Sequence, residues 1–122
     1  MNILKPIISE SVYKILYNLV TRKKSTEVKQ LGKELSKAQI VKDVLLGTKI
    51  VSLNSIVEFI SSTLIKPIRM QIVLPEEANL GQRKISIFAP ISIALLGFKE
   101  SDHFTWEMPS GFKKLTIIKV LN

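Results

Sequence analysis

The sequence has 122 residues, of which 46% are hydrophobic and 23% charged, a composition that favours one folded domain, alone or with a small appendage, over a disordered chain. It contains no cysteine and one histidine, His103, which excludes disulfide frameworks, thiolate metal sites and multi-histidine metal centres. The formal net charge is +8, and +6 of it falls in residues 1–49, which hold ten basic and four acidic side chains.

Residues 1–47 are expected to form an antiparallel helical hairpin. Apolar residues recur at helical spacing over residues 12–19, and Ser9 is a suitable N-cap for this first helix. After a polar break, a second apolar stripe runs over residues 28–45 and ends at Gly47, a residue type that commonly follows a helix C-terminus. Two helices joined by a short connection predict an antiparallel pair.

Residues 48–122 are expected to form an antiparallel sheet packed on a short helix. Apolar residues alternate with polar ones in several short runs, which predicts strands near residues 51–59, 68–74, 85–87, 104–108 and 115–120. Residues 91–97 are apolar nearly all round and close on Gly97, which predicts one or two turns of buried helix. The fold class predicted for the chain is therefore α+β.

Few patterns in the sequence suggest catalytic chemistry. The S-x-x-K pattern occurs at Ser11/Lys14 and at Ser110/Lys113, but neither place promises the buried pocket that lowers a lysine pKa, so both are interpreted as structural. Nothing near His103 in the sequence orients it as an acid or base, so it is expected to be a surface residue.

Two further features have a functional and a structural interpretation. Glu76 and Glu77 are adjacent acids that could bind a hard cation, but a solvated loop is the favoured interpretation. Trp106 is expected in the core rather than at an interface. The sequence thus predicts no metal, no cofactor, no small-molecule substrate and no enzymatic activity.

No export or membrane segment is expected. Glu10 and Lys14 interrupt the apolar residues among the first twenty, and no run approaches the length of about 18 apolar residues that crosses a membrane. The protein is expected to be cytoplasmic.

Several stretches resemble the Gre transcription factor family. Residues 85–97 are similar to the S-P-x-x-x-A-L-L-G motif of the Gre C-terminal domain, and an aromatic strand, a turn at residues 109–111 and a last strand follow in the same order. Residues 51–57, VSLNSIV, resemble the V-x-x-N-S-x-V pattern of a short Gre relative, the regulator of nucleoside diphosphate kinase (Rnk). Residues 31–38 resemble the L-x-x-E-L-x-x-A pattern of its second helix. The likeness spans about residues 27–121.

This resemblance implies an FKBP-like fold without isomerase activity, and bacterial RNA polymerase as the partner. In Gre factors the C-terminal domain docks at the rim of the polymerase secondary channel. The matching docking segment here consists of Phe88, Ala89, Pro90 and Ile91. Gre factors have Asp-Ser-Pro in this segment, so only Pro90 carries over, and the contact of this chain is expected to be more apolar.

The predicted hairpin tip departs from the Gre pattern. Gre factors carry two acidic residues at the tip of a long coiled coil, where they help to hold the catalytic magnesium of the polymerase. Here the tip contains Arg22, Lys23 and Lys24 with one acid, Glu27, and the second helix, at about 18 residues, spans only about 27 Å. We therefore expect no stimulation of transcript cleavage. A basic tip is expected to occupy the channel mouth or to touch phosphates.

Two other functions remain open. A basic nucleic-acid-binding module would use Arg22, Lys23, Lys24 and Lys29, would bind without sequence preference, and would lose affinity steeply with salt. An FKBP-like enzyme is a weaker alternative, because the sequence offers no pocket and no acid–base pair. The excess of lysine is equally typical of a soluble surface with no acidic partner.

Overall fold

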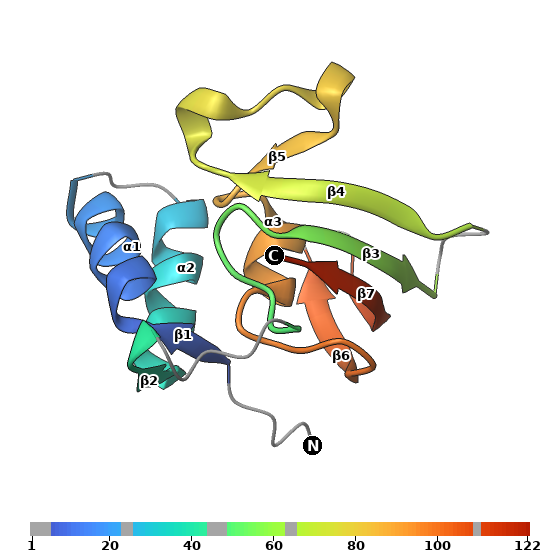
Figure 1. The fold of residues 1–122 in the computed structure, drawn as a ribbon, viewed down its shortest axis with the longest axis horizontal. Helices are drawn as coiled ribbons and strands as arrows, with labels where there is room; N and C mark the ends of the chain where they lie inside the picture. The colour runs from blue at the N-terminus through green and yellow to red at the C-terminus, as the bar shows by residue number, and fades with distance from the viewer. Residues whose placement is uncertain (1–5, 23–25, 44–48, 63–65, 109–110) are drawn as a thin grey trace.

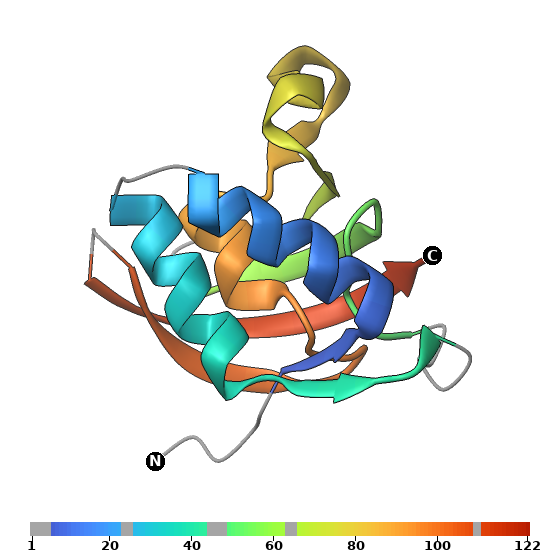
Figure 2. The same cartoon turned by 90° about the vertical axis from the view of Figure 1, so that its left-hand side faces the viewer.

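The computed structural model describes residues 6–22, 26–43, 49–62, 66–108 and 111–122, and it confirms the α+β class: a helical layer lies over one face of a sheet (Figures 1 and 2). The first part of the chain forms β1 (Ile7–Ser9), α1 (Glu10–Arg22), α2 (Thr26–Lys37) and β2 (Gln39–Val41). The second part forms β3 (Ile56–Ser61), β4 (Ile68–Val73), the 3₁₀ turns η2 (Pro75–Glu77) and η3 (Leu80–Gln82), β5 (Lys84–Ser86), α3 (Pro90–Leu95), β6 (His103–Met108) and β7 (Gly111–Leu121).

The first helix begins where the sequence predicts. Ser9 lies just before α1, and its hydroxyl oxygen accepts a hydrogen bond from the backbone N–H of Val12 at 3.4 Å, so Ser9 is the N-cap. Glu10 lies in the first turn, where a negative charge is favourable beside the positive end of the helix dipole. Leu16 is fully buried on the inner face of the helix.

The second helix is shorter than predicted. It ends at Lys37, and residues 39–41 form β2, which pairs in parallel with β1. The backbone N–H of Gln39 donates to the carbonyl of Pro6 at 2.8 Å, and this pairing overrides the helical spacing of the apolar residues. The prediction of one helix up to Gly47 is therefore wrong from residue 38 onward, and Gly47 itself lies outside the described residues.

The five main strands form one mixed sheet in the order β5-β4-β3-β7-β6. Neighbouring strands are antiparallel except for β4 and β5, which are parallel, so the expectation of a fully antiparallel sheet is wrong for that pair. Parallel neighbours need a connection longer than a hairpin turn, and residues 74–83 supply it through η2 and η3.

A single hydrophobic core joins the helical part to the sheet. The short helix α3 lies between α2 and the sheet and packs against both α2 and β6 (Figure 2). As predicted, Ala94, Leu95 and Leu96 are buried. The other large, fully buried side chains come from both parts of the chain: Leu16, Leu31, Val51, Val57, Ile72, Ile87, Ile93, Leu115, Ile117 and Val120. Because both parts share this core, the division into domains at residues 1–47 and 48–122 stays a prediction.

Gly97 allows the chain before α1 to cross the end of α3. Its φ of +84° lies in the left-handed region, and a Cβ atom placed there would be 2.5 Å from the Cβ of Pro6 and 2.7 Å from the backbone nitrogen of Ile7. The carbonyl of Gly97 accepts a hydrogen bond from that Ile7 nitrogen at 2.9 Å. Only a residue without a side chain fits this crossing, which gives the glycine of the Gre-like motif a packing role.

The loop that leads into β3 is held by side chains of the VSLNSIV stretch. Asn54 has a φ of +73°, a conformation that asparagine tolerates better than most residues. The buried hydroxyl of Ser55 accepts a hydrogen bond from the backbone N–H of Ser52 and donates one to the side-chain oxygen of Asn122. The Asn122 amide donates in turn to the carbonyl of Ile50. The Asn-Ser pair thus ties this loop to the last residue of the sequence.

Candidate functional site

The docking segment proposed from the sequence forms the turn that leads into α3. The backbone N–H of Ala89 donates to the Ser86 carbonyl at 3.0 Å, and the N–H of Phe88 donates to the Ser86 hydroxyl oxygen at 3.0 Å. Ala89 is the N-cap of α3, and Pro90 follows at the first helical position, where its missing N–H leaves no hydrogen bond unmade. Ser86 and Pro90 therefore fix the shape of this turn.

The same segment is the part of α3 that reaches the surface. Pro90 is exposed, Phe88, Ala89 and Ile91 are half-buried, and residues 92–95 are buried. The side chains of Phe88 and Ile91 pack partly against the core, so only part of each is open to a partner. The segment thus presents a small, rigid apolar surface, which provides contact area and no acid–base chemistry.

The predicted hairpin tip lies on the same side of the molecule as this segment. Arg22 is exposed at the C-terminal end of α1, and Glu27 lies in the first turn of α2. Figures 1 and 2 show the start of α2 next to the start of α3, and in Figure 1 the end of α1 lies on the far side of α2; α2 packs against both α1 and α3. Lys23, Lys24 and the side chain of Glu27 lie outside the described part of the structure. The helix ends on either side of the predicted tip therefore lie at the same end of the helical layer as the start of α3.

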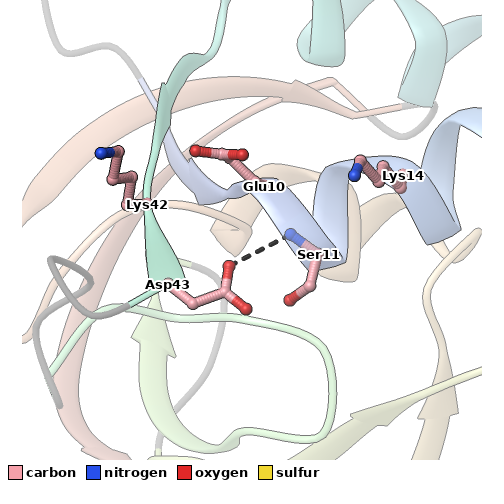
Figure 3. A pocket seen from close by; sticks show the side chains of 5 residues that line it. All are labelled: Glu10, Ser11, Lys14, Lys42 and Asp43. Carbon is pink, nitrogen blue, oxygen red and sulfur yellow. Dashed lines mark hydrogen bonds between the residues drawn. The ribbon is translucent and has the colours of Figure 1, made fainter.

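An open pocket of about 400 Å³ lies where β2 passes the start of α1 (Figure 3). It is lined by Glu10, Ser11, Lys14, Lys42 and Asp43. The Asp43 carboxylate accepts a hydrogen bond from the backbone N–H of Ser11 at 3.1 Å, so it caps the first turn of α1 from a residue 32 positions away.

The charge of Asp43 is stabilised by this arrangement. Hydrogen bonds from the Ser11 hydroxyl and then from the Ser11 backbone hold the pKa of Asp43 below its ordinary value, and Lys14 adds a smaller favourable charge interaction. Lys14 is exposed, so the Ser11/Lys14 pair lacks the buried surroundings that its catalytic use requires. The pocket thus belongs to the cap of α1. Ser110, in the second S-x-x-K pattern, lies outside the described residues.

The remaining residues singled out in the sequence lie apart from one another. His103 is exposed on β6, and Glu76 and Glu77 are exposed on η2. Trp106 is half-buried against the core and packs edge-to-face on Phe104 with ring centroids 6.4 Å apart. Among the described ranges, no three His, Asp or Glu side chains gather in a group that could hold a metal ion. The helices in these ranges are also too short or too polar to cross a membrane.

Two features were missed in the sequence. The first is the capping role of Asp43, because no local sequence pattern indicates that a residue caps a helix that begins about 32 positions earlier. The second is Leu80, the first residue of η3, whose apolar side chain is 73% exposed. Its position in a turn-rich loop between two strands was the one available signal.

The fold defines a small α+β protein in which a short helical pair packs, through α3, on a mixed five-stranded sheet. A family model described as "Transcription elongation factor, GreA/GreB, C-term" matches residues 46–122. The chain therefore belongs to the GreA/GreB family, and the Gre resemblance of the sequence is confirmed.

Individual relatives support the same assignment. "Transcription elongation factor GreA" of Thioalkalivibrio sulfidiphilus is 35% identical over 95 residues, which cover 76% of this chain and 60% of that protein. GreA of Alkaliphilus oremlandii is 33% identical, over 76% of this chain and 58% of its own length. The match thus spans about three-fifths of these curated relatives.

Solved structures match the fold over nearly the whole chain. A "prokaryotic transcription elongation factor GreA/GreB" from Nitrosomonas europaea superposes with a TM-score of 0.77 at 28% identity, covering 98% of this chain and 99% of that one. Thermus aquaticus Gfh1 matches with a TM-score of 0.52 at 19% identity, over 97% of this chain and 99% of its own, which shows a shared fold alone.

Proposed function

We propose that this chain is a transcription factor that binds bacterial RNA polymerase and does not stimulate transcript cleavage. Its membership of the GreA/GreB family supports the polymerase as the partner. The observation that carries the proposal is the apolar turn before α3, which the sequence resemblance matches to the Gre docking segment. Pro90 is exposed there and held in a fixed shape, so the cost of ordering it on binding is small.

The short helical pair supports the second half of the proposal. With 13 residues in α1 and 12 in α2, the two helices reach only about 18–20 Å. Through Leu16, Leu31 and Leu35 they are also part of the core shared with the sheet, instead of standing free of it. Residues 22–27 contain a single acid, Glu27, among three cations. Such a tip supplies too few carboxylate oxygens to help hold the catalytic magnesium of the polymerase.

The basic hairpin is proposed to assist association rather than to anchor the complex. Charges at the rim of an interface mainly raise the association rate, and salt weakens their effect. Arg22 together with Lys23 and Lys24 is therefore expected to act through steering, whereas Phe88 and Pro90 supply the contacts that slow dissociation. The rival nucleic-acid function predicts the opposite roles for the two segments.

Polymerase binding is tested with core RNA polymerase immobilised on a sensor surface, in the presence of nuclease and at several salt concentrations. Pro90→Asp is expected to raise Kd at least tenfold at every salt concentration, because it places a charge in the apolar contact. Its matched control is Pro67→Asp, since Pro67 is also an exposed proline but lies before β4, away from the segment.

The triple variant Arg22→Ser, Lys23→Ser, Lys24→Ser is expected to bind polymerase more slowly at low salt and as fast as the wild type at high salt. Loss of binding in this variant at every salt concentration, with Pro90→Asp unaffected, contradicts the division of roles. Phe88→Asp is a further variant, interpreted only if its unfolding curve shows that it is folded, because Phe88 also packs against the core.

The absence of cleavage stimulation is tested on stalled elongation complexes. The purified chain is expected to leave nascent RNA at its original length, while a long Gre factor with an acidic tip, added in parallel, shortens it. Magnesium-dependent shortening by this chain contradicts the proposal.

A further inference from the structure

Strand β6 lies at one edge of the main sheet. In the strand order β5-β4-β3-β7-β6 it comes last, so it pairs with β7 on one side and with no strand of the described chain on the other (Figure 1). Its pairing with β7 runs over its whole length without a shift in register. At the opposite edge, β5 has only 3 residues, compared with 6 in β6. The open side of β6 is thus the longer and more regular of the two sheet edges.

The sequence of β6 does nothing to block this edge. Proteins commonly protect an edge strand with a proline, a lysine or a bulge, because its free backbone groups otherwise pair with another strand. The sequence HFTWEM contains neither proline nor lysine, and the pairing with β7 shows no bulge. Helix α3 also packs against β6, but from the face of the sheet (Figure 2). The edge is therefore open to a further strand.

Hydrogen bonds show which backbone groups of β6 point away from β7. Opposed residues in an antiparallel pair are alternately hydrogen-bonded and not hydrogen-bonded to each other. The N–H of Ile117 donates to the carbonyl of Asp102 at 2.9 Å, one residue before β6 begins. Every second pair after this one therefore carries the bonds between β6 and β7. The residues between those pairs direct their N–H and carbonyl groups to the open edge: His103, Thr105 and Glu107.

A hydrogen bond on the other side of β7 gives the same alternation. The N–H of Ser62 donates to the carbonyl of Lys114 at 2.9 Å, so the backbone of Lys114 bonds toward β3. Its partner on β6 is Thr105, whose own backbone groups consequently point away from β7. The side chains of His103, Thr105 and Glu107 are all exposed as well. The open edge thus offers the N–H and carbonyl groups of these three residues together.

We propose that this edge joins two copies of the chain, with β6 antiparallel to β6 of the second copy and Thr105 opposite Thr105 on the two-fold axis. His103 of each copy then lies opposite Glu107 of the other, and every outward N–H and carbonyl group of both strands is paired. A shift of one residue sets outward groups against residues that bond to β7, and a shift of two leaves outward groups unpaired. The pairing does not depend on the proposed function.

The side chains that meet in this register are complementary, which favours a second copy over an unrelated strand. The ring N–H of His103 can donate to the carboxylate of Glu107 of the second copy, and the two-fold axis repeats this contact. On the opposite face, Phe104 lies opposite the half-buried Trp106 of the second copy, and aromatic cross-strand pairs are favourable. Within the paired strands, no two like charges lie opposite each other.

The net charge of +8 on each copy does not prevent this contact. The basic residues of β7 nearest the axis are Lys113 and Lys114, which lie one strand inward from β6. Each is three strand spacings, about 14 Å, from its counterpart in the second copy. This distance exceeds the screening length of about 10 Å in 0.1 M salt. The repulsion between the two copies is therefore weak at physiological salt.

Sedimentation velocity measures the pairing directly, over a concentration series that reaches the millimolar range. We expect a reversible dimer with a Kd in the micromolar range, because a single strand pair buries less surface than a standard interface. His103→Glu is expected to raise this Kd about tenfold, since it sets two pairs of acids opposite each other, and the double variant His103→Glu, Glu107→Lys is expected to restore it. Both residues are exposed, so the variants should keep the unfolding midpoint of the wild type. A wild type that stays monomeric, or a dimer that His103→Glu leaves unchanged, contradicts the proposal.

The absence of cysteine from the sequence allows a second test by cross-linking. Thr105→Cys places one thiol of each copy at the axis, where hydrogen-bonded antiparallel partners have Cα atoms about 5.5 Å apart, a separation that a disulfide spans. Lys114→Cys is the matched control, because it is exposed beside Thr105 but about 14 Å from its counterpart. Under mild oxidation only Thr105→Cys is expected to form a covalent dimer. Equal cross-linking of the two variants, or none in Thr105→Cys, contradicts the pairing of β6 and leaves the proposed function unaffected.

Discussion

Replacing Gly97 by alanine tests how the chain before α1 is joined to α3. The new Cβ would lie 2.5 Å from the Cβ of Pro6 and 2.7 Å from the Ile7 nitrogen, and backbone atoms cannot yield as the end of a flexible side chain can. The φ of +84° adds the cost of a left-handed residue, about 1–2 kcal/mol. Relieving the overlap by moving β1 costs a further ~1–3 kcal/mol, which is typical of overpacking. The total expected loss of unfolding free energy is about 2–5 kcal/mol.

Gly111→Ala is the matched control for this prediction. Gly111 also has a positive φ, +115°, but a Cβ added there meets no heavy atom within 4 Å. Its substitution therefore carries the backbone cost without the overlap. Urea denaturation of the three proteins is expected to show that Gly97→Ala loses about 1–3 kcal/mol more than Gly111→Ala. Equal losses in the two variants would refute the argument that contact with Pro6 and Ile7 requires the glycine.

Amide hydrogen exchange shows which hydrogen bonds are weakened in Gly97→Ala. The Ile7 amide donates to the Gly97 carbonyl, and the Gln39 amide donates to the Pro6 carbonyl, so both bonds depend on the position of the chain before α1. We expect both amides to exchange faster in Gly97→Ala and to keep their wild-type protection in Gly111→Ala. Unchanged protection of the Ile7 amide in Gly97→Ala would show that the overlap is relieved elsewhere.

The remaining predictions concern the core, the helix cap and the loop before β3. Leu95→Ala is expected to lower the free energy of unfolding by about 2–5 kcal/mol, because Leu95 is fully buried, and a loss below about 0.5 kcal/mol in denaturant melts would contradict its place in the core. Asp43→Asn is expected to be less stable than the wild type at pH 7. The folded-state pKa of Asp43 lies below its ordinary value of 3.8, so the wild type keeps this contribution above that value and loses it as pH falls through the lowered pKa. The difference between the two proteins should therefore vanish in strong acid, and a difference that grows as pH falls would contradict the cap. Ser55→Ala is expected to cost about 1–3 kcal/mol, because it removes the two hydrogen bonds of the buried Ser55 hydroxyl, each worth about 0.5–1.5 kcal/mol, and urea denaturation measures it.

The sequence predicts the elements whose patterns are local. The N-cap Ser9, the buried helix after Pro90 and the strands β6 and β7 each follow from residue types a few positions apart, and the structure confirms them. The alternation predicted near residues 51–59 is a strand only from Ile56 on, because residues 51–55 form the loop before β3. The prediction of the second helix is wrong beyond Lys37 because residues 39–41 pair with β1, which lies about thirty positions earlier in the sequence. Ile40 and Val41 have high strand propensity, but the partner that uses it cannot be found in the local pattern.

The candidate site is predicted in the same uneven way. The turn at Phe88–Ile91 has a signature of its own, a proline followed by an apolar run; Pro90 is exposed and its neighbours are half-buried, and their role in docking stays a prediction. Leu80 has no such signature: it lies in the connection that the parallel pairing of β4 with β5 requires. That pairing is a property of the whole sheet. Both features that the sequence missed, Asp43 at the cap and Leu80 between β4 and β5, therefore depend on how separate elements come together rather than on a local pattern.

The central claim is that this chain binds core RNA polymerase at the site used by Gre factors, through Pro90 and its neighbours. Competition measures it most directly: a fixed amount of labelled wild-type chain is bound to core polymerase with nuclease present, and an unlabelled long Gre factor is added in increasing amounts. We predict that the Gre factor displaces the labelled chain completely, and that unlabelled Pro90→Asp displaces it only at concentrations at least tenfold higher than the unlabelled wild type. Binding that nuclease abolishes, or binding that the Gre factor leaves unchanged, would contradict the claim.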